Sequence, residues 1–453
     1  MTILRGAHRA ETAGATGEQT RVSSLPNGVR VVTLRMPWLA SASVSVFVRT
    51  GSGHESAREN GISHVVEHMA FKGTATRDAA RINIDAERLG AEVNAHTDKD
   101  HTAYHLRGMA DDAGAFVGML GDIVRHSVFP EGELERERQV ILQEFLEDDE
   151  DPLSTAFRQF DKTCYGTHPL AQSVIGTRRN IERFTRADLL DYTQRQYTGA
   201  NMIVAAAGRV EHDEIVRAAE AAFGAMPAGE AHTMTAPTWV GGVKAVRLAG
   251  CSQSHVVLGY PIATQKDDDP AASVAAALFG EGMSSPLMNE IREKRGLVYY
   301  AACSADVMET CGQFVIEAST TPDKVDELLG ETRRLLGAHA RHVGAFDLQR
   351  ARKQIAVRRL RAQERPSRRV EDAALDLFML GHVRAPEELR ERMESVTAER
   401  VRETFERMLA STPTLAVAGK LGSLTADRLR ELVLAPRAPA RRTYGSRRPG
   451  LNH

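Results

Sequence analysis

The amino-acid sequence predicts an α+β fold made of two homologous α/β halves, each containing strands and helices. The first observation is a repeat. The segments beginning at Ile181 and Met393 both contain a helix that starts after threonine, a polar link, and an apolar strand ending in Ala-Gly. Their offset of about 210 residues indicates a duplicated domain rather than a short structural repeat. The second observation is that residues 227–242 are rich in Pro, Gly, Thr and Ala, which is typical of a boundary. The matching positions are Thr185 and Gly208 in the first half, and Thr397 and Gly419 in the second.

These observations divide the chain into five parts. The N-terminal segment lacks the apolar core of a secretory signal, and the C-terminal segment is basic and rich in Pro. We therefore expect a cytoplasmic protein whose two ends are disordered. The expected parts are a leader at 1–20, a catalytic half at 21–226, a linker at 227–244, a second half at 245–435 and a tail at 436–453.

Strands and helices are expected to alternate in the first half. Runs of β-branched and alternating apolar residues predict strands, and apolar residues at helical spacing predict helices. Ser63 is expected to cap the first helix, which would end near Gly73. The expected strands lie within 27–36, 41–52, 91–109 and 201–210, and the further helices within 78–89, 111–126, 131–148 and 212–226.

The overall composition excludes several classes of function. The net charge is −2, so no long-range field favours nucleic acid or an anionic membrane. No apolar run reaches the ~20 residues that a membrane span needs. The four cysteines show no Cys-x-x-Cys spacing and are few for so long a chain, so we expect a reducing compartment and no disulfide framework.

The segment GISHVVEHMAFKGT, which begins at Gly61, contains two histidines four residues apart. On a helix, residues i, i+3 and i+4 share one face, so His64, Glu67 and His68 would converge. Two imidazoles and a carboxylate on one face favour a metal ion with a general base beside it. The alternative is an amphipathic helix whose histidines form hydrogen bonds in the core or face solvent.

A catalytic zinc site takes three protein ligands, so these histidines need a third. In the helix EGELERERQVILQEFLEDDEDP, Glu137 and Glu144 lie two turns apart, on or beside the apolar stripe. A carboxylate removed from water needs a cation or strong donors, and zinc would satisfy Glu144. Spacing alone leaves Glu133 and Glu147 open as alternatives.

Together these residues predict metal-assisted amide hydrolysis. Zinc would lower the pKa of its bound water toward ~7. Glu67 would accept the water's proton and later pass it to the leaving amine.

The motif and its surroundings resemble one peptidase family. His64-Val-Val-Glu67-His68 is the inverted His-x-x-Glu-His zinc motif. The segments EHMAFKGT, LGAEVNAHTDKDHTAYH and FGEGMSSPLMNEIREKRGLVYY are also similar to the pitrilysin, insulinase and mitochondrial processing peptidase family, in its bacterial processing-peptidase-like branch. The resemblance implies one zinc ion per chain, with His64, His68 and Glu144 as ligands. It also implies Glu67 as the catalytic base and Glu137 as a supporting acid.

The resemblance assigns further residues to the substrate. Asn94 and Ala95 would lie on an edge strand that pairs with an extended peptide. Arg292 and Tyr299 would reach from the second half to the substrate or to the developing oxyanion. The implied fold is a clamshell around a chamber, which would admit peptides or unfolded segments. Chains of this length in the family pair as homodimers or with a related chain.

A competing function is a non-catalytic binding or assembly subunit, since the family includes members that lost catalysis. Such members usually lose a ligand or the base, and this chain keeps all four residues. Two positions depart from the family. Pro286 replaces an arginine in the second-half loop and could reshape it. Glu281 replaces a glycine, from which we hypothesise a preference for basic peptides.

Overall fold

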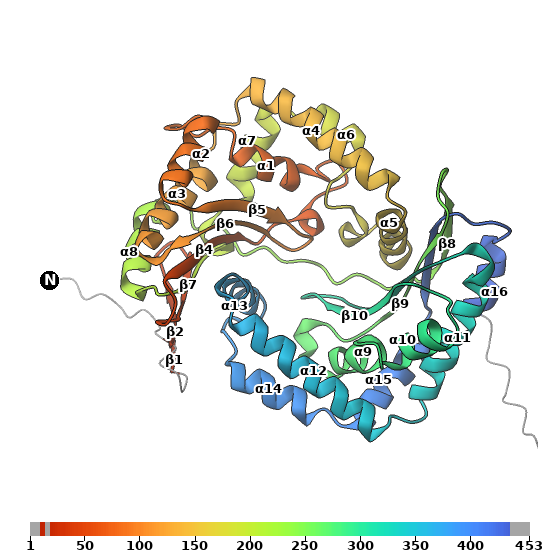
Figure 1. Cartoon of the computed structure of the whole chain (residues 1–453). Helices are drawn as coiled ribbons and strands as arrows, with labels where there is room; N and C mark the ends of the chain where they lie inside the picture. The colour runs from red at the N-terminus through yellow and green to blue at the C-terminus, as the bar shows by residue number, and fades with distance from the viewer. Residues whose placement is uncertain (1–9, 14–18, 435–453) are drawn as a thin grey trace, which may run out of the picture.

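The computed structural model describes residues 10–13 and 19–434, which form two mixed sheets flanked by helices (Figure 1). The first sheet has the strand order β1-β2-β3-β7-β4-β6-β5, and the second has the order β10-β11-β9-β12-β8. The strands of the first sheet are β1 (Ala10–Ala13), β2 (Gln19–Ser24), β3 (Arg30–Arg35), β4 (Ser41–Val48), β5 (Glu92–Thr97), β6 (Thr102–Met109) and β7 (Met202–Gly208). Those of the second are β8 (Gly242–Arg247), β9 (Ser254–Pro261), β10 (Ala301–Val307), β11 (Gly312–Thr320) and β12 (Thr414–Gly419).

The helices follow the same duplication. Those of the first half are α1 (Ile62–Ala70), α2 (Ala79–Arg88), α3 (Ala113–His126), α4 (Glu131–Glu150), α5 (Pro152–Tyr165), α6 (Arg178–Arg183), α7 (Arg186–Gln196) and α8 (His212–Phe223). Those of the second half are α9 (Ala271–Gly280), α10 (Pro286–Met288), α11 (Val325–His339), α12 (Ala345–Gln363), α13 (Pro366–Leu380), α14 (Pro386–Ser395), α15 (Ala398–Ala410) and α16 (Ala426–Leu434).

The two sheets share one topology, which confirms the predicted pair of homologous halves. The order β3-β7-β4-β6-β5 matches β8-β12-β9-β11-β10 strand for strand. β7 pairs parallel with β3 and antiparallel with β4, and β12 pairs parallel with β8 and antiparallel with β9. Gly208 and Gly419 end these central strands with φ of 125° and 104°. A Cβ at either glycine would lie within 2.5 Å of a carbonyl oxygen, that of Ser41 or Gln253, at the start of the neighbouring strand, so both positions need glycine.

Each half lends one helix to the other half's sheet. α5 packs on β8, β9 and β12, whereas α13 packs on β3, β4 and β7. Phe160 of α5 is buried with Val257 and Ala416, and Leu377 of α13 is buried with Ile203. The opposite face of the first sheet is covered by α3 and α8, and that of the second by α9 and α15. The last three residues of the proposed linker, 242–244, already belong to β8 of the second sheet, and hydrophobic packing joins the two halves across it.

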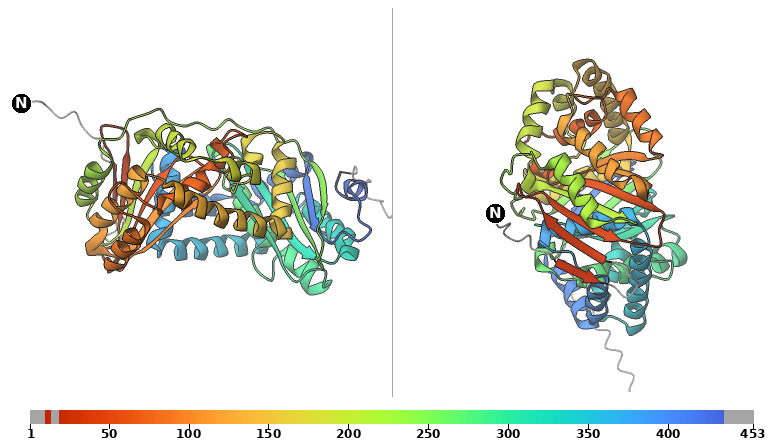
Figure 2. Two further views of the ribbon diagram at one scale, coloured as in Figure 1. Left: turned by 90° about the horizontal axis from the view of Figure 1, so that it is seen from above. Right: turned by 90° about the vertical axis from the view of Figure 1, so that its left-hand side faces the viewer.

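The prediction of a disordered leader is wrong for part of that segment. Residues Ala10–Ala13 form β1, which pairs antiparallel with β2 at the edge of the first sheet (Figure 2). The physical reason is that β2 offers a row of free backbone groups on its outer side, and a preceding strand satisfies them. The rest of the leader before Gln19, and the proposed tail at 436–453, lie outside the described residues.

None of the helices within the described ranges is both long enough and apolar enough to cross a lipid bilayer.

Candidate metal centre

A buried carboxylate fixes the N-terminus of α1, the helix that contains the two motif histidines. Glu55 is 1% exposed. Its Oε2 accepts the Gly61 N–H at 2.7 Å, and its Oε1 accepts the Ser63 N–H at 2.8 Å. The predicted cap, Ser63, is wrong because α1 begins after Gly61. The Ser63 hydroxyl instead forms a hydrogen bond of 2.7 Å with the Tyr192 hydroxyl.

Glycine is required where α1 begins. Gly61 has φ of 98°, a left-handed conformation. A Cβ there would lie 2.8 Å from the Cα of Gly176, which also has a positive φ. These two glycines let the start of α1 press against the loop before α6. The first residues of the helix are thereby held in place from two sides.

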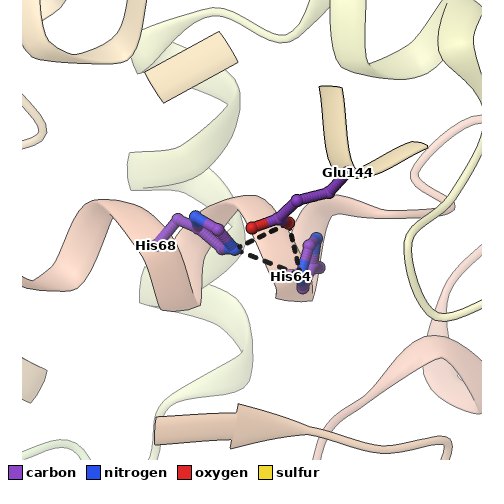
Figure 3. A group of neighbouring side chains, drawn as sticks. All are labelled: His64, His68 and Glu144. Atoms are coloured by element: carbon purple, nitrogen blue, oxygen red, sulfur yellow. Dashed lines mark hydrogen bonds and ion pairs between the residues drawn. The ribbon is translucent and has the colours of Figure 1, made fainter. Parts of the chain in front are cut away.

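Three predicted ligands come together between α1 and α4 (Figure 3). The Nε2 atoms of His64 and His68 lie 3.2 Å apart. Glu144 Oε2 lies 3.8 Å from His64 Nε2 and 3.4 Å from His68 Nε2. The alternatives on α4 are engaged elsewhere, since Glu133 pairs with Arg136 and Glu147 accepts a hydrogen bond from Gln143.

The chemistry of this donor set fits a zinc ion. Glu137 Oε1 lies 3.0 Å from His68 Nδ1 and accepts its proton, which leaves a lone pair on Nε2. That lone pair faces the Glu144 carboxylate and a second imidazole nitrogen. Such electron-rich atoms at these distances repel one another unless a proton or a metal cation lies between them. Two neutral histidines and a carboxylate are also a common ligand set for zinc.

Burial keeps the first histidine neutral. Burial, together with the nearby His68, lowers the pKa of His64 to about 3. Metal binding requires a neutral imidazole, so this site needs no proton release from His64 at neutral pH. Glu137 differs, because it is ionised despite being only 7% exposed. Burial opposes its charge, but hydrogen bonds from Lys72 and His68 lower its pKa. The Lys72 Nζ lies 2.7 Å from Glu137 Oε2.

Glu67 lies beside the ligand set without belonging to it. Thr97 Oγ1, at the end of β5, donates a hydrogen bond of 2.7 Å to Glu67 Oε2. Burial raises the pKa of Glu67, and the Thr97 hydrogen bond opposes that shift. Glu67 and His64 line a cavity of about 610 Å³ together with Ala95. A carboxyl group with a raised pKa in such a cavity is suited to accept and return a proton.

The predicted substrate strand is an edge strand, as expected. β5 pairs with β6 on one side and ends the first sheet on the other. Ala95 is half-buried and lines the cavity, whereas Asn94 is exposed. The Asn94 side-chain oxygen accepts the Ala95 N–H at 2.8 Å. A peptide adding to this edge would have to displace the Asn94 side chain from that N–H.

Arg292 and Tyr299 lie in the second half and contact each other. The Arg292 guanidinium carbon stands 5.3 Å from the centroid of the Tyr299 ring, and Tyr299 is 82% exposed. Among the described residues, the hydrogen bonds and ion pairs of Arg292 go to Met283 and Glu293 rather than to the metal set. Pro286 does not disturb its loop. It is the first residue of α10, where proline fits, and the Ser285 side chain caps that helix.

In the second half, α9 offers no counterpart to the metal set. α9 follows β9 as α1 follows β4, and it therefore occupies the matching place in the topology. Its sequence, AASVAAALFG, contains neither histidine nor glutamate. Within the described residues, the duplicated fold thus keeps this ligand set in the first half only.

Comparison with known proteins identifies the family. Residues 30–178 match the model of the insulinase family (peptidase family M16), and residues 183–355 match the model called the peptidase M16 inactive domain. An uncharacterized zinc protease of Rickettsia bellii is 32% identical over 89% of this chain and 98% of its own length. The mitochondrial-processing peptidase subunit beta of Saccharomyces cerevisiae is 28% identical over 84% of this chain and 86% of its own.

Solved structures agree on the fold. A protease from Helicobacter pylori matches with a TM-score of 0.82 at 21% identity, covering 89% of this chain and 100% of that chain. A Pseudomonas fluorescens structure titled as a peptidase M16 inactive domain matches with a TM-score of 0.81 at 22% identity, covering 88% of this chain and 98% of that one. The two facing α+β halves are therefore the clamshell of these proteins. This chain belongs to the insulinase family, peptidase family M16.

Proposed function

We propose that the chain is a zinc-dependent endopeptidase that hydrolyses peptides or unfolded segments enclosed between its halves. The arrangement of the three ligand side chains and Glu67 supports this proposal most. Three ligand atoms converge within 4.8 Å of one another, and Glu67 lies on the same helix as two of them. The cavity that contains His64 and Glu67 also reaches the edge strand β5.

His64, His68 and Glu144 would hold one zinc ion per chain. Glu137 keeps the His68 imidazole in the tautomer that offers Nε2, and Lys72 balances the charge of Glu137. Bound zinc supplies a Lewis acid that polarises the scissile carbonyl and acidifies water.

Glu67 would act as the general base and later as the general acid. Its carboxylate accepts a proton from water as water attacks the carbonyl carbon, and it then donates that proton to the leaving amine nitrogen. Thr97 holds one carboxylate oxygen and leaves the other free for this transfer. Thr97 is on β5, the strand that would bind substrate. The same strand would therefore position both Glu67 and the peptide.

The edge of β5 would bind the substrate backbone through Asn94 and Ala95. Backbone pairing gives affinity with little demand on sequence, which suits a protease of unfolded segments. Arg292 and Tyr299 would contact the substrate from the second half. They would donate hydrogen bonds to the oxygen of the scissile carbonyl or to other substrate atoms near it. We further propose that the chain pairs with itself or with a related chain, because one of its relatives is named as a subunit.

The decisive experiment compares the wild-type protein with Glu67→Gln on a mixed pool of unstructured peptides. Cleavage is followed by mass spectrometry, and zinc content is measured in the same samples. We expect cleavage to fall by about 10²- to 10⁴-fold in the variant while zinc stays bound. Equal cleavage by both proteins would refute the role of Glu67. Absence of cleavage in both would instead favour a non-catalytic subunit.

A further inference from the structure

A second group of metal-binding side chains lies on the hairpin that joins β5 to β6. Within the part of the chain that the structure describes, His96, Asp98 and His101 bring one ligand atom each within 4.8 Å of one another. His96 Nε2 and His101 Nε2 are 3.3 Å apart, and Asp98 Oδ2 is 3.9 Å from His101 Nε2. We propose that these three residues form a second transition-metal site, distinct from the His64, His68 and Glu144 set.

The separation of the two nitrogens suits a single metal ion. Two imidazole nitrogens bound to one tetrahedral zinc at about 2.05 Å lie roughly 3.3 Å apart. The His96–His101 pair has this separation, and the His64–His68 pair is nearly the same at 3.2 Å. The two histidine pairs are thus equally close to the geometry that a metal requires.

A carboxylate orients His101 as Glu137 orients His68. Asp100 Oδ1 accepts the proton of His101 Nδ1 at 2.7 Å, so in the neutral imidazole the lone pair lies on Nε2, toward His96. This carboxylate–histidine pairing is the usual support of a metal-bound imidazole. The His101 ring is held further by burial, with 3% exposure and the Phe47 ring 5.8 Å away.

The turn between the two histidines is held from both sides. The Ser52 N–H donates to the Asp98 carbonyl at 3.2 Å, and the Gly53 N–H donates to the Lys99 carbonyl at 2.7 Å. A Cβ at Gly51 would lie 2.1 Å from the Asp98 carbonyl oxygen, so glycine permits this approach. On the other side, the Lys99 Nζ pairs with Asp161 of α5 at 2.6 Å. A turn fixed in this way holds its ligands in place before the metal arrives.

The donors indicate which ions would bind. Two imidazoles and one carboxylate suit Zn²⁺, Co²⁺ or Ni²⁺ better than Mg²⁺ or Ca²⁺, which prefer oxygen ligands. Asp98 is exposed, so an ion could reach the group from solvent on the Asp98 side. Thr97, which holds Glu67, lies between His96 and Asp98 in the sequence. A metal ion here would therefore stiffen the segment that positions the proposed base.

Metal counting on the full-length protein tests this proposal. The wild type and three variants are equilibrated with a small excess of Zn²⁺, freed of unbound metal, and analysed by elemental mass spectrometry. The variants are His64→Gln with His68→Gln, His96→Gln with His101→Gln, and all four changes together. We expect two ions in the wild type, one in each double variant and none in the quadruple variant.

His105→Gln is the matched control. His105 lies on β6, and its ring centroid is 5.9 Å from that of His96, but it does not belong to the ligand group. This variant is expected to keep two ions. In a parallel experiment, Co²⁺ added to the His64/His68 double variant should give visible absorption bands that disappear in the quadruple variant. Circular dichroism verifies that each protein is folded.

The outcomes separate the two sites. If the His64/His68 double variant binds no metal, or if the His96/His101 double variant binds as much as the wild type, the second site is refuted. If instead the His64/His68 double variant binds as much as the wild type, the first ligand set fails while the second is unaffected. The proposal therefore stands or falls independently of the peptidase function.

Discussion

Thr97 and Glu67 are joined by a hydrogen bond of 2.7 Å that links the edge strand β5 to the helix of the metal set. The Thr97 hydroxyl donates to the ionised carboxylate, which lowers the pKa of Glu67 against the effect of burial. In Thr97→Val this donor is lost and the pKa rises. We expect kcat/KM to fall about 10-fold and the acidic limb of its pH profile to move to higher pH.

The pH profile of kcat/KM distinguishes an effect of Thr97 on the pKa of Glu67 from a purely structural effect. Zinc content should be unchanged in Thr97→Val, because Thr97 contacts no ligand of the first set. Thr235→Val serves as the control, since Thr235 is exposed and its hydroxyl pairs with His168 outside the site. A profile that falls in height without moving along the pH axis would argue against the link to Glu67.

Glu137 should affect metal affinity more than it affects folding. Its carboxylate accepts the His68 Nδ1 proton and pairs with Lys72. In Glu137→Gln the acceptor is weaker and the charge is gone, so His68 becomes a poorer ligand. We expect zinc affinity to fall about 10- to 100-fold in competition with a chelator. Glu147→Gln, nearby on the same helix, should change affinity little, and equal losses in both variants would contradict the prediction.

Glu55 should stabilise the whole metal helix. Its two oxygens accept the backbone N–H groups of Gly61 and Ser63, which otherwise have no partner at the start of a helix. Glu55→Ala would leave them buried without acceptors. We expect a loss of about 2 kcal/mol, seen as a lower melting temperature, together with weaker zinc binding.

The same experiment on Glu59→Gln provides the comparison. Glu59 is close in sequence and pairs with Arg195 on the surface. An exposed pair of this kind contributes under about 1 kcal/mol. If Glu55→Ala and Glu59→Gln melt at the same temperature, the capping role is refuted.

The placement of the two histidines could be predicted because it depends only on local geometry. His64, Glu67 and His68 share a helix face at any place where that helix forms. Glu144 needed the resemblance as well, since spacing alone also allowed Glu133 and Glu147. The duplicated topology was visible because Thr185 and Thr397 both cap helices before buried strands.

Other features depend on contacts that sequence spacing does not encode. Glu55 lies on a short loop, and only the folded chain brings it under the start of α1. A usable signal was present, because an acidic residue precedes a glycine that begins a helix. The exchange of α5 and α13 between halves was also not predicted. Each has an apolar face, but the pattern does not say which sheet that face covers.

The charges around the second half lead to a prediction about substrates. Glu281, from which we hypothesised a preference for basic peptides, already pairs with Arg358 at 2.5 Å. Half of the side chains that line the adjoining cavity of about 730 Å³ are basic, and they outnumber the acidic ones, Glu281 and Glu371. The basic side chains include Arg107, Lys353, Arg361, Arg365 and Arg368. We therefore expect Glu-rich peptides to be cleaved faster than Arg-rich peptides of equal length, with a difference that shrinks at high salt.

A charge reversal tests the source of this preference. Arg361→Glu combined with Arg365→Glu should reduce the ratio of Glu-rich to Arg-rich cleavage, mainly through KM. Arg430→Glu, on the distant surface of α16, should leave the ratio unchanged. Faster cleavage of the Arg-rich peptide by the wild type would restore the original hypothesis.

Arg49 and Glu309 tie the two halves together, and their contact should depend on pH. Arg49 follows β4 of the first sheet and lies 2.5 Å from Glu309, in the turn between β10 and β11. Both side chains are at most 15% exposed, and Lys266 pairs with the same carboxylate at 3.0 Å. Burial opposes the charge of Glu309, but hydrogen bonds from Arg49 and Lys266 lower its pKa below the ordinary 4.5.

A lowered pKa in the folded state stabilises the fold above about pH 4.5, and this stabilisation is lost as pH falls through the folded-state value. At pH 7, Glu309→Gln should therefore cost about 2 kcal/mol and lower the melting temperature. Near pH 4 the difference from the wild type should shrink, because the Glu309 carboxylate of the unfolded wild-type chain, with its ordinary pKa of 4.5, takes up a proton before the folded one does. Glu327→Gln removes a more exposed pair with Arg295 inside the second half and should show a smaller effect at pH 7. A gap between Glu309→Gln and the wild type that is equally large at both pH values would show that the stabilisation does not come from the ionised carboxylate.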